Sequence, residues 1–528
     1  MSRPNVIIIL NDDMGYSDIG CYGGEVETPH LDRLAAGGIR FSQFYNTARC
    51  SPSRASLLTG LHPHQTGIGI LTDDDGPDGY PGNLNRQCVT IAELLQQGGY
   101  RTYMSGKWHL ANDIHNENHT WPLQRGFDRF YGTLAGAGSY FRPMTLMRDN
   151  EHIDGEELPE NYYYTDAISA QAASFVEDHN AVYPDRPFFM YVAYTAPHWP
   201  LHAKEEDISK YKGRFDAGWD ALRERRLARL KSLGIISEET ALSERDSSLP
   251  DWERAEHKEY LLRCMEAYAA QIDAMDQGIG RLVDTLERTG QLDNTLLFFL
   301  SDNGGCAEVI QPEARIGAEK KGVAPTRTRN GKEVAFGNDP TVMPGAEGSY
   351  QSYGVAWANL SNTPFRLYKH WVHEGGIATP FIAHWPERIR SKGDIVHTPW
   401  QLTDVLPTVL EVSGTSYPDA YRGNALVSPE GESFASLFDG DVLARGPLYW
   451  EHEGNAAVRM LNWKLVKKHA QPWELYDMNE DRTEQNDLAE QHPDFVAELS
   501  MLYDEWALRC GVIPREQILK LKKSQSHQ

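Results

Sequence analysis

Short apolar runs that end in polar clusters alternate with helical patterns along this chain, which is typical of a mainly parallel sheet flanked by helices. Helical periodicity predicts helices over Thr28–Gly38 and Ile91–Gln97. The pattern therefore indicates an α/β fold with a large mixed, mainly parallel sheet flanked by helices. The apolar runs predict its buried strands at Val6–Leu10, Tyr100–Met104, Phe188–Tyr194, Thr295–Leu300 and Phe381–His384.

Between the third and fourth of these strands the chain is strongly charged. Ala217–Leu233 and Glu253–Thr289 combine helical periodicity with many Arg, Glu and Asp residues. We expect solvated helices that cover one face of the sheet. From Gly304 to Ser361 the chain is rich in Gly, Pro, Asn and Thr, and a loop of this length in a compact enzyme is usually functional or mobile. Asp404–Val412 is helical again.

The end of the chain follows a different pattern. A helix is predicted over Pro493–Arg509. We therefore expect a catalytic domain over residues 1–420 and a smaller C-terminal domain over residues 421–528. A small antiparallel sheet in this second domain is predicted from Leu448–Glu451, Ala457–Met460, Trp463–Lys467 and Trp473–Tyr476.

Composition and charge narrow the class of protein. The 528 residues include 51 basic and 75 acidic side chains, a net charge of −24, so general binding to nucleic acid or to an anionic membrane is not expected. The apolar run Val6–Leu10 is too short for a secretory signal or a membrane span. The 6 cysteines lack paired spacing and do not indicate a disulfide scaffold. These features favour a soluble, cytoplasmic α/β enzyme.

Ionisable residues follow the first four predicted strands. Ligands bind outside the carboxyl ends of the strands of such a sheet. An Asp after a single strand is more often a turn or helix cap, but four such clusters at one sheet edge indicate an active site. The clusters are Asp12 and Asp13, Lys107 and His109, His198, and Asp302 and Asn303.

Two of these clusters offer only hard oxygen ligands. Asp12, Asp13, Asp302 and Asn303 suit Ca²⁺ or Mg²⁺ better than zinc, and the residues alone favour Ca²⁺ only weakly. Without a cation, three carboxylates in contact would force at least one of them to take up a proton. A divalent ion would relieve this repulsion and supply positive charge for an anionic substrate.

Cys50 is predicted at the N-terminus of a helix. Pro52 suits the first turn of that helix and Gly60 suits its end. Backbone N–H groups at a helix N-terminus favour an anion or a nucleophilic oxyanion. Arg54, four residues after Cys50, lies on the same helix face. Taken alone, Cys50 would more often be a small buried cysteine.

This region of the chain resembles the signature of type I, formylglycine-dependent sulfatases. The matching residues are Cys50-Ser51-Pro52-Ser53-Arg54 and Leu57-Leu58-Thr59-Gly60. In that family the cysteine is oxidised after translation to Cα-formylglycine. The likeness covers most of the chain and is nearest to bacterial arylsulfatases of the alkaline-phosphatase superfamily, including cytoplasmic ones. Further family blocks are similar to Asn11-Asp12-Asp13-Met14-Gly15, Gly106-Lys107-Trp108-His109-Leu110, Ala196-Pro197-His198-Trp199-Pro200, Ser301-Asp302-Asn303-Gly304-Gly305 and Lys369 before Glu374-Gly375-Gly376.

The resemblance implies hydrolysis of sulfate monoesters to an alcohol or phenol and inorganic sulfate. Cys50, as formylglycine, would be hydrated to a geminal diol that attacks sulfur and forms a covalent sulfo-enzyme. A formylglycine-generating or anaerobic sulfatase-maturating enzyme would be the partner in maturation. One Ca²⁺ would be bound by Asp12, Asp13, Asp302 and Asn303.

The resemblance also implies a role for each remaining polar residue. Arg54 and Lys107 would hold the nucleophile and the sulfate. His198 and Lys369 would surround the ester oxygen and help protonate the departing group. His109 would take a proton from the second hydroxyl of the diol, which expels sulfate and restores the aldehyde. Lys107 and His109 are two residues apart, so in an extended chain they would face the same side.

The chemistry beside this resemblance is coherent. A serine or an unmodified cysteine would form a sulfate adduct that water has to attack, whereas a geminal diol carries a second oxygen and lets the adduct collapse by elimination. Lysine, arginine and a divalent cation balance the charge on the sulfuryl oxygens in the transition state.

Three alternatives remain beside a sulfatase. A phosphonate monoester or phosphodiester hydrolase can use the same modified cysteine, but Lys107, His109 and Asn303 favour sulfate esters. A metal-stabilised binding protein would be expected to lack Cys50, and an unmodified thiol phosphatase needs a longer loop between Cys50 and Arg54.

The substrate alcohol, aryl, alkyl or carbohydrate, and the oligomeric state stay open. Pocket walls are expected from residues 111–165 and 304–368, with Gly337–Trp357 as a further candidate wall. Other histidines that could line the pocket are His62, His64, His115, His119 and His370.

Overall fold

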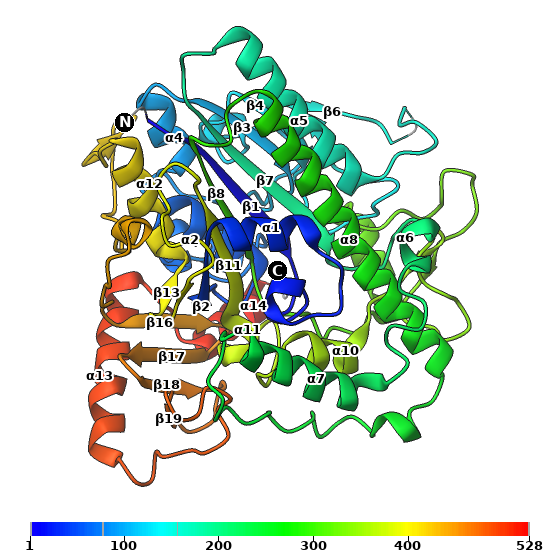
Figure 1. Ribbon diagram of the computed structural model, residues 1–528, viewed down its shortest axis with the longest axis vertical. Helices are drawn as coiled ribbons and strands as arrows, with labels where there is room; N and C mark the ends of the chain where they lie inside the picture. The colour runs from blue at the N-terminus through cyan, green and yellow to red at the C-terminus, as the bar shows by residue number, and fades with distance from the viewer. Residues whose placement is uncertain (1–2, 77–78, 156, 526–528) are drawn as a thin grey trace.

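A large mixed sheet forms the centre of the computed structural model, which describes residues 3–76, 79–155 and 157–525 (Figure 1). The described residues form an 11-stranded sheet in the order β12-β2-β11-β8-β1-β7-β3-β4-β5-β6, with β13 paired to β2. These strands are β1 Asn5–Asp12, β2 Ile39–Tyr45, β3 Arg101–Gly106, β4 Arg129–Thr133, β5 Leu146–Arg148, β6 Glu151–His152, β7 Phe188–Pro197, β8 Thr295–Ser301, β11 Ala378–His384, β12 Ile395–Val396 and β13 Trp400–Gln401.

Helices cover both faces of this sheet, because side chains along a strand point alternately to either side. Ile7 and Ile9 of β1 belong to one core, which they share with α1, α5, α7, α8 and α10, whereas Val6 and Ile8 belong to a second core with α2, α4 and α12. The helices are α1 Pro29–Gly37, α2 Cys50–Thr59, α3 Pro63–Thr66, α4 Ile91–Gln97, α5 Tyr164–Val182, α6 Glu205–Ser209, α7 Gly218–Ser232, α8 Lys258–Arg288, α9 Arg315–Lys320, α10 Gly354–Ser361, α11 Glu374–Ile377, α12 Val405–Ser413, α13 Pro493–Cys510 and α14 Arg515–Gln525.

The predicted α/β class and the five predicted strands are confirmed, but one orientation differs. The pairs β1–β7, β1–β8 and β3–β7 are parallel. The fifth predicted strand, β11, runs antiparallel to both β8 and β2. Its direction depends on the path of the chain between strands, which the local apolar pattern does not record.

Three segments differ from the sequence prediction. Strand β2 and helix α5 are present where no element is predicted. The stretch Gly304–Ser361 is not one long loop, because it contains α9, α10 and the short strands β9 (Ala335–Phe336) and β10 (Ser349–Tyr350). A further two-stranded pair, β14 (Ala420–Tyr421) and β15 (Asn424–Ala425), lies at the predicted boundary between the two domains.

The C-terminal region holds the predicted antiparallel sheet with α13 along its outer face (Figure 1). Ala456 and Leu465 pack against Trp506 of α13. On the opposite face Trp450 and Val466 belong to the core of the main sheet. The strands are β16 Leu448–His452, β17 Asn455–Met460, β18 Trp463–Lys467 and β19 Glu474–Asp477.

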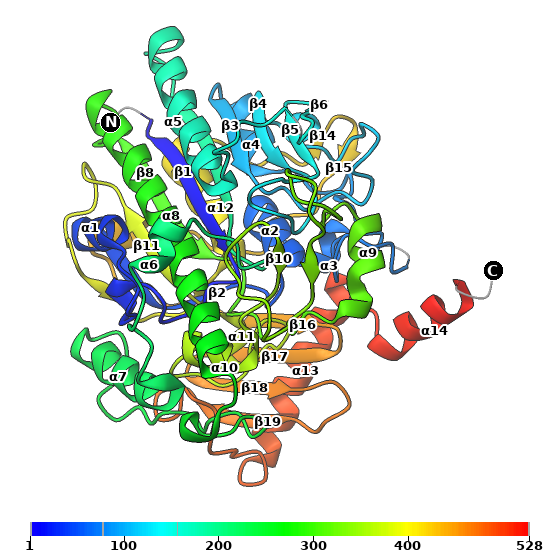
Figure 2. The same ribbon diagram turned by 90° about the vertical axis from the view of Figure 1, so that its right-hand side faces the viewer.

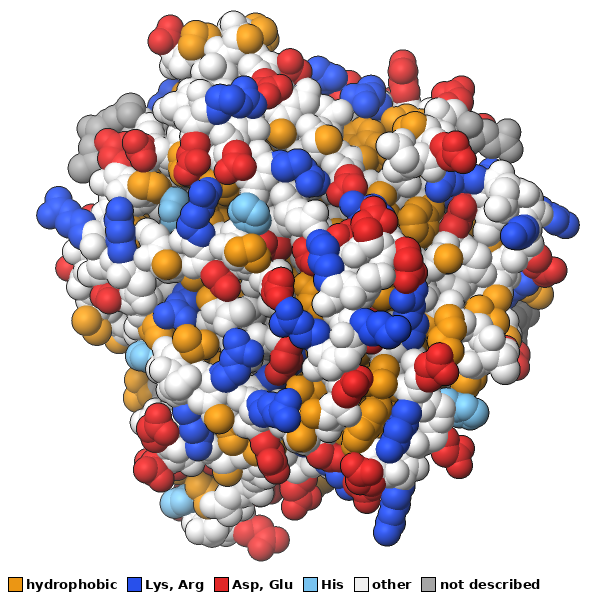
Figure 3. Space-filling model, turned by 45° about the vertical axis from the view of Figure 1, so that its right-hand side comes forward, with side chains coloured by type: hydrophobic (Ala, Val, Ile, Leu, Met, Phe, Trp, Pro, Cys, Tyr) orange, Lys and Arg blue, Asp and Glu red, His pale blue; other side chains and the backbone are white. Residues whose placement is uncertain are grey.

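The surface and the termini add two observations. On the face drawn in Figure 3 acidic and basic side chains are interspersed. Helix α14 lies at the edge of the molecule at the C-terminal end, where Ile518 packs against Ile70 and Tyr80 (Figure 2). Along the described part of the chain, no helix combines the length and the apolar character that a membrane crossing requires.

Candidate active site

The clusters predicted at the strand ends lie side by side, because β8, β1, β7 and β3 are consecutive neighbours in the sheet. Asp12 is the last residue of β1, and Asp302 directly follows the adjacent β8. Lys107 directly follows β3, and His198 directly follows β7. The parallel order of these strands thus brings residues far apart in the sequence to one edge of the sheet.

Close packing at this edge constrains the backbone. Gly106 ends β3 with a φ of 120°, and a Cβ placed there would lie 1.9 Å from the carbonyl oxygen of Ala193 in β7. Only glycine fits this position, which directs the chain from β3 to Lys107. Asp13 also has a positive φ, of 68°, in the left-handed region that is uncommon for residues other than glycine.

The acidic residues form one buried cluster. The backbone N–H of Asp13 donates to Asp302 Oδ1 at 3.3 Å, and Asn303 Nδ2 donates to Asp13 Oδ1 at 2.7 Å. Asp12, Asp302 and Asn303 are fully buried, and Asp13 is nearly so. The sequence prediction that these four side chains converge is therefore confirmed in geometry.

Two oxygens of this cluster fit a bound cation. Within the described residues, Asp12 Oδ1 and Asn303 Oδ1 are buried and have no hydrogen-bond donor. A buried acceptor without a donor costs free energy unless another partner satisfies it. Apart from His198 Nε2, which lies 3.4 Å from Asp13 Oδ2, the ligand atoms of this cluster are carboxylate and amide oxygens, which suit Ca²⁺.

The protonation states support the same conclusion. Burial opposes ionisation of Asp12, but Lys107, His198 and Arg54 hold the pKa of this carboxyl well below its usual range. Burial together with the charge of Asp12 raises the pKa of Asp302 to about 7. One carboxyl of the cluster thus holds its proton to a much higher pH than an ordinary carboxyl when no cation is bound, as the sequence argument expects.

Three basic side chains neutralise the carboxylates. Arg54 Nη2 donates to Asp302 Oδ2 at 2.8 Å, and Lys107 Nζ donates to Asp12 Oδ2. Lys369 Nζ lies 2.7 Å from Asp13 Oδ1. Burial opposes the charge on Lys369, but Asp13 raises its pKa well above the usual range, so the ammonium stays protonated.

Cys50 is the first residue of α2, as predicted. Helix α2 ends at Thr59 and is followed by the cap residue Gly60, which has a φ of 68°, and Pro52 lies in its first turn. Cys50 is buried and lines the cavity, whereas Arg54, one turn later, is fully buried and contacts Asp302. The helix therefore presents position 50 to the cavity and its arginine to the carboxylates.

A cavity of about 360 Å³ opens beside this cluster. Its apolar wall includes Leu71, Ile114, Leu134 and Val323. Walls from residues 111–165 and 304–368 are confirmed. None of the described residues that line this cavity comes from Gly337–Trp357, but Ser352 and Tyr353 line a small pocket that also includes Asp13. The candidate site residues on its surface are Cys50, His109, His198 and Lys369.

The two histidines differ in their surroundings. His198 Nδ1 lies 2.6 Å from the carbonyl of Trp199, so Nδ1 carries the proton and the unprotonated Nε2 faces Lys369 Nζ at 3.4 Å. Burial, with Lys107 and Arg54, lowers the pKa of His109 far below its usual value, so this ring is neutral. Its Nδ1 is buried and has no partner among the described residues.

The route from Lys107 to His109 is not extended. His109 has a φ of 53°, in the left-handed region, so the argument from an extended chain is wrong. Of the further histidines proposed from the sequence, His115 alone lines the described cavity.

The sequence prediction assigned no role to three residues at the cavity. Glu308 accepts hydrogen bonds from Arg49 Nη1 at 2.9 Å and from Trp199 Nε1 at 3.1 Å. Both Arg49 and Trp199 flank predicted site residues in sequence, which is the signal that could have identified them. Glu308 stands in an irregular stretch, so only the fold reveals its proximity.

Comparisons with known proteins agree with this geometry. The family model "Sulfatase" matches residues 4–415, and the model "N-sulphoglucosamine sulphohydrolase, C-terminal" matches residues 365–503. An uncharacterized sulfatase of Schizosaccharomyces pombe is 32% identical over 97% of this chain and 94% of its own length. The arylsulfatase of Klebsiella aerogenes is 37% identical over 78% of this chain and 87% of its own length.

A solved structure gives the same result at the level of the fold. Ps i-CgsB in complex with k-i-k-neocarrahexaose is 25% identical, with a TM-score of 0.67, and covers 96% of this chain and 93% of its own. The buried acidic cluster, the cysteine at the start of α2 and these likenesses together show that the chain belongs to the sulfatase family, the hydrolases of sulfate esters.

Proposed function

We propose that this enzyme hydrolyses sulfate monoesters with Cys50 converted to Cα-formylglycine. The observation that carries the proposal is the position of Cys50, at the N-terminus of α2 and on the cavity wall with His109, His198 and Lys369. The modified residue supplies a hydrated aldehyde as nucleophile. Helix N–H groups beside it favour the developing negative charge.

The acidic cluster is proposed to hold one Ca²⁺ through Asp12, Asp13, Asp302 and Asn303. The unpartnered buried oxygens of Asp12 and Asn303 support this assignment. The ion would supply positive charge beside the sulfate oxygens. Arg54 and Lys107, which already neutralise Asp302 and Asp12, would orient the nucleophile and the sulfate from below the cavity.

Proton transfers are assigned from the hydrogen bonds of the two histidines. His198 Nδ1 is committed to the carbonyl of Trp199, so its Nε2 accepts from Lys369. Lys369 is therefore the group that delivers a proton toward the departing oxygen, with His198 orienting the ammonium. The neutral ring of His109 suits a base that takes the proton from the second hydroxyl when sulfate leaves.

The substrate is proposed to be an aryl or saccharide sulfate. A relative is named an arylsulfatase, and a structural neighbour was solved in complex with k-i-k-neocarrahexaose. The apolar wall around Ile114 and Leu134 supports a flat aryl or sugar ring at the cavity mouth. No observation at this site favours the phosphonate monoester or phosphodiester alternative.

Further proposals concern maturation, compartment and organisation. A formylglycine-generating or anaerobic sulfatase-maturating enzyme would modify Cys50 in the cytoplasm. Residues 1–420 would form the catalytic domain and residues 421–528 the C-terminal domain.

The test is the variant Cys50→Ala with Cys264→Ala as the matched control. Cys264 is also buried but belongs to a core away from the cavity. Cys50→Ala is expected to abolish hydrolysis of 4-nitrophenyl sulfate with unchanged circular dichroism, and the control is expected to retain turnover. Near-normal turnover by Cys50→Ala would overturn the proposal.

A further inference from the structure

A second group of side chains that could bind a metal lies where the C-terminal sheet meets the segment after Lys369. His370 has a φ of 90°, and its backbone N–H donates to the carbonyl of Ala48 at 2.8 Å. His452 ends β16, and Glu453 begins the turn into β17. The hairpin therefore brings a histidine and a glutamate against the residue that follows Lys369.

The three side chains point their ligand atoms toward one another. His370 Nδ1 lies 3.0 Å from Glu453 Oε2, and His452 Nε2 lies 3.7 Å from the same oxygen. One ligand atom of each residue lies within 4.8 Å of the other two. Ligands held about 2.0–2.1 Å from a tetrahedral zinc ion are separated by about 3.4 Å, so the carboxylate and both rings are near bonding positions.

The imidazole of His452 is the second, independent observation. Its side chain is 1% exposed, and neither Nδ1 nor Nε2 has a hydrogen-bond partner among the described residues. A neutral imidazole carries one donor and one acceptor, and burying both without partners is unfavourable. A metal ion bound to Nε2 would remove this cost for one of them.

We propose that His370, His452 and Glu453 bind a Zn²⁺ ion, separate from the oxygen-rich cluster at Asp12. Two imidazole nitrogens and one carboxylate oxygen are a ligand set that zinc prefers and calcium does not. The side chain of His370 is 32% exposed, so the ion can enter from solvent and complete its shell with water.

The neighbours of the cluster are compatible with this ion. Arg515 Nη2 pairs with Glu453 Oε1 and leaves Oε2 directed at the two histidines. The contact of Asn455 Nδ2 with His370 Nε2, at 3.4 Å, is long and would be lost, since a ring bound through Nδ1 carries its proton on Nε2. The zinc ion replaces this weak contact with a coordinate bond.

The site would position a catalytic group. His370 directly follows Lys369, whose Nζ lies 2.7 Å from Asp13 Oδ1. A zinc ion bridging His370 and the β16–β17 hairpin fixes the chain on one side of Lys369 to the C-terminal sheet. His370, His452 and Glu453 are therefore positioning residues rather than groups that contact the substrate.

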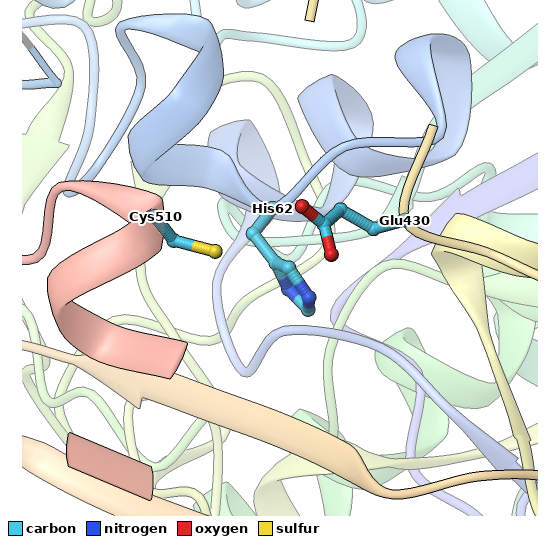
Figure 4. Close-up of side chains that lie close together, drawn as sticks. All are labelled: His62, Glu430 and Cys510. Carbon is cyan, nitrogen blue, oxygen red and sulfur yellow. The ribbon is translucent and has the colours of Figure 1, made fainter. Parts of the chain in front are cut away.

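A third cluster, His62, Glu430 and Cys510, provides a contrast (Figure 4). Arg509 occupies both oxygens of Glu430, with Nη2 at 2.9 Å from Oε2, and Gln65 Nε2 donates to Oε1 at 2.7 Å. Both oxygens of Glu430 are therefore paired with side chains outside the cluster. Glu453 differs, because its Oε2 faces the two histidines. Its residues serve as matched controls.

The experiment measures Zn²⁺ bound per chain in the full-length enzyme held in excess Ca²⁺, by equilibrium dialysis and elemental analysis. The wild-type chain is expected to bind one Zn²⁺ and to gain thermal stability from it. His452→Ala and Glu453→Gln are expected to weaken Zn²⁺ binding by about 100-fold or more while circular dichroism is unchanged. His62→Ala is expected to bind zinc as the wild type does.

Two results would overturn the proposal. One is the absence of Zn²⁺ binding by the wild-type chain in excess Ca²⁺. The other is equal binding by His452→Ala and the wild type. If His62→Ala lost zinc while His452→Ala kept it, the ion would belong to the cluster of Figure 4 and the proposal would fail. If His452→Ala loses zinc and its kcat falls while KM is unchanged, this would support the role of the site in positioning Lys369.

Discussion

At the scale of single residues, the key feature of the proposed mechanism is which side chain carries the proton that the leaving group needs. Lys369 stays charged beside Asp13, and His198 offers it only an unprotonated Nε2. In the proposed mechanism, the proton that reaches the ester oxygen therefore comes from Lys369. This assignment distinguishes the lysine from groups that only bind the sulfate.

Replacing Lys369 tests this assignment. Lys369→Ala is expected to lower kcat/KM for an alkyl sulfate by about 10²–10⁴-fold, because general acid catalysis contributes this much for a poor leaving group. The loss for 4-nitrophenyl sulfate should be smaller, since nitrophenolate departs without a proton. Rates across a series of phenols and alcohols measure the difference. An equal loss across the series would mean that Lys369 binds sulfate and does not act as the acid.

Calcium should stabilise the protein more strongly as the pH rises. The pKa of Asp302 without the ion is about 7, against an ordinary value of 3.8. Between these values the folded chain holds a proton that the unfolded chain has released, so the ion-free fold loses stability as the pH rises. Calcium competes with that proton, and its effect on Tm should grow from about pH 5 to about pH 8. Melting with and without chelator measures this, and a Tm shift independent of pH would contradict it.

The sequence predicted most residues of the site because each stands in a short block directly after a strand or at a helix start. Their contacts could not be predicted in the same way. The pairing of Glu308 with Arg49 and Trp199 joins three separate segments. No local pattern records which loop folds over which strand end.

At the scale of elements, strands buried on both faces were predictable because their apolar runs are continuous. Strand β2 was not, since Arg40, Ser42 and Gln43 interrupt its run although it pairs with β11, β12 and β13. Helix α5 was missed for a related reason. Its buried face includes Ser169 and His179, whose hydrogen bonds to Tyr194 and Tyr103 satisfy them inside the core.

Helix α14 is expected to support one wall of the cavity by packing against the segment that forms it. Ile518 is buried against Ile70 and Tyr80, and the next residue after Ile70, Leu71, lines the cavity. Ile518→Ala should loosen this wall and raise KM for aryl sulfates several-fold, with kcat within about twofold of the wild type. Leu519→Ala, on the exposed side of α14, is the control. Steady-state kinetics that showed a fall in kcat with constant KM would contradict a role in the wall.

At the scale of the whole molecule, the C-terminal sheet is joined to the main sheet through buried ionic contacts. Lys464 of β18 is fully buried, with Nζ 2.9 Å from Glu374 Oε1 at the start of α11 and 2.8 Å from Glu484 Oε1. This connection, like the packing of Trp450 into the main core, links segments that are distant in sequence. The sequence predicted the small sheet correctly but could not reveal how it contacts the main sheet.

Removal of Lys464 should destabilise the entire protein. Lys464→Met leaves Glu374 and Glu484 buried with one fewer cation, which is expected to cost about 3–5 kcal/mol of unfolding free energy. Lys212→Met, at an exposed lysine, should change it by less than about 0.5 kcal/mol. Urea unfolding followed by fluorescence measures the unfolding free energy of both variants. Similar changes for the two would contradict a stabilising role of the buried contact.

The central claim, that the nucleophile at position 50 is not the encoded cysteine, is tested most directly by the mass of the peptide that contains this residue. Conversion to formylglycine lowers that mass by about 18 Da. In preparations with different degrees of conversion, specific sulfatase activity should rise in proportion to the converted fraction and extrapolate to zero without it. Full activity in a preparation whose peptide carries only the unmodified thiol would contradict the account.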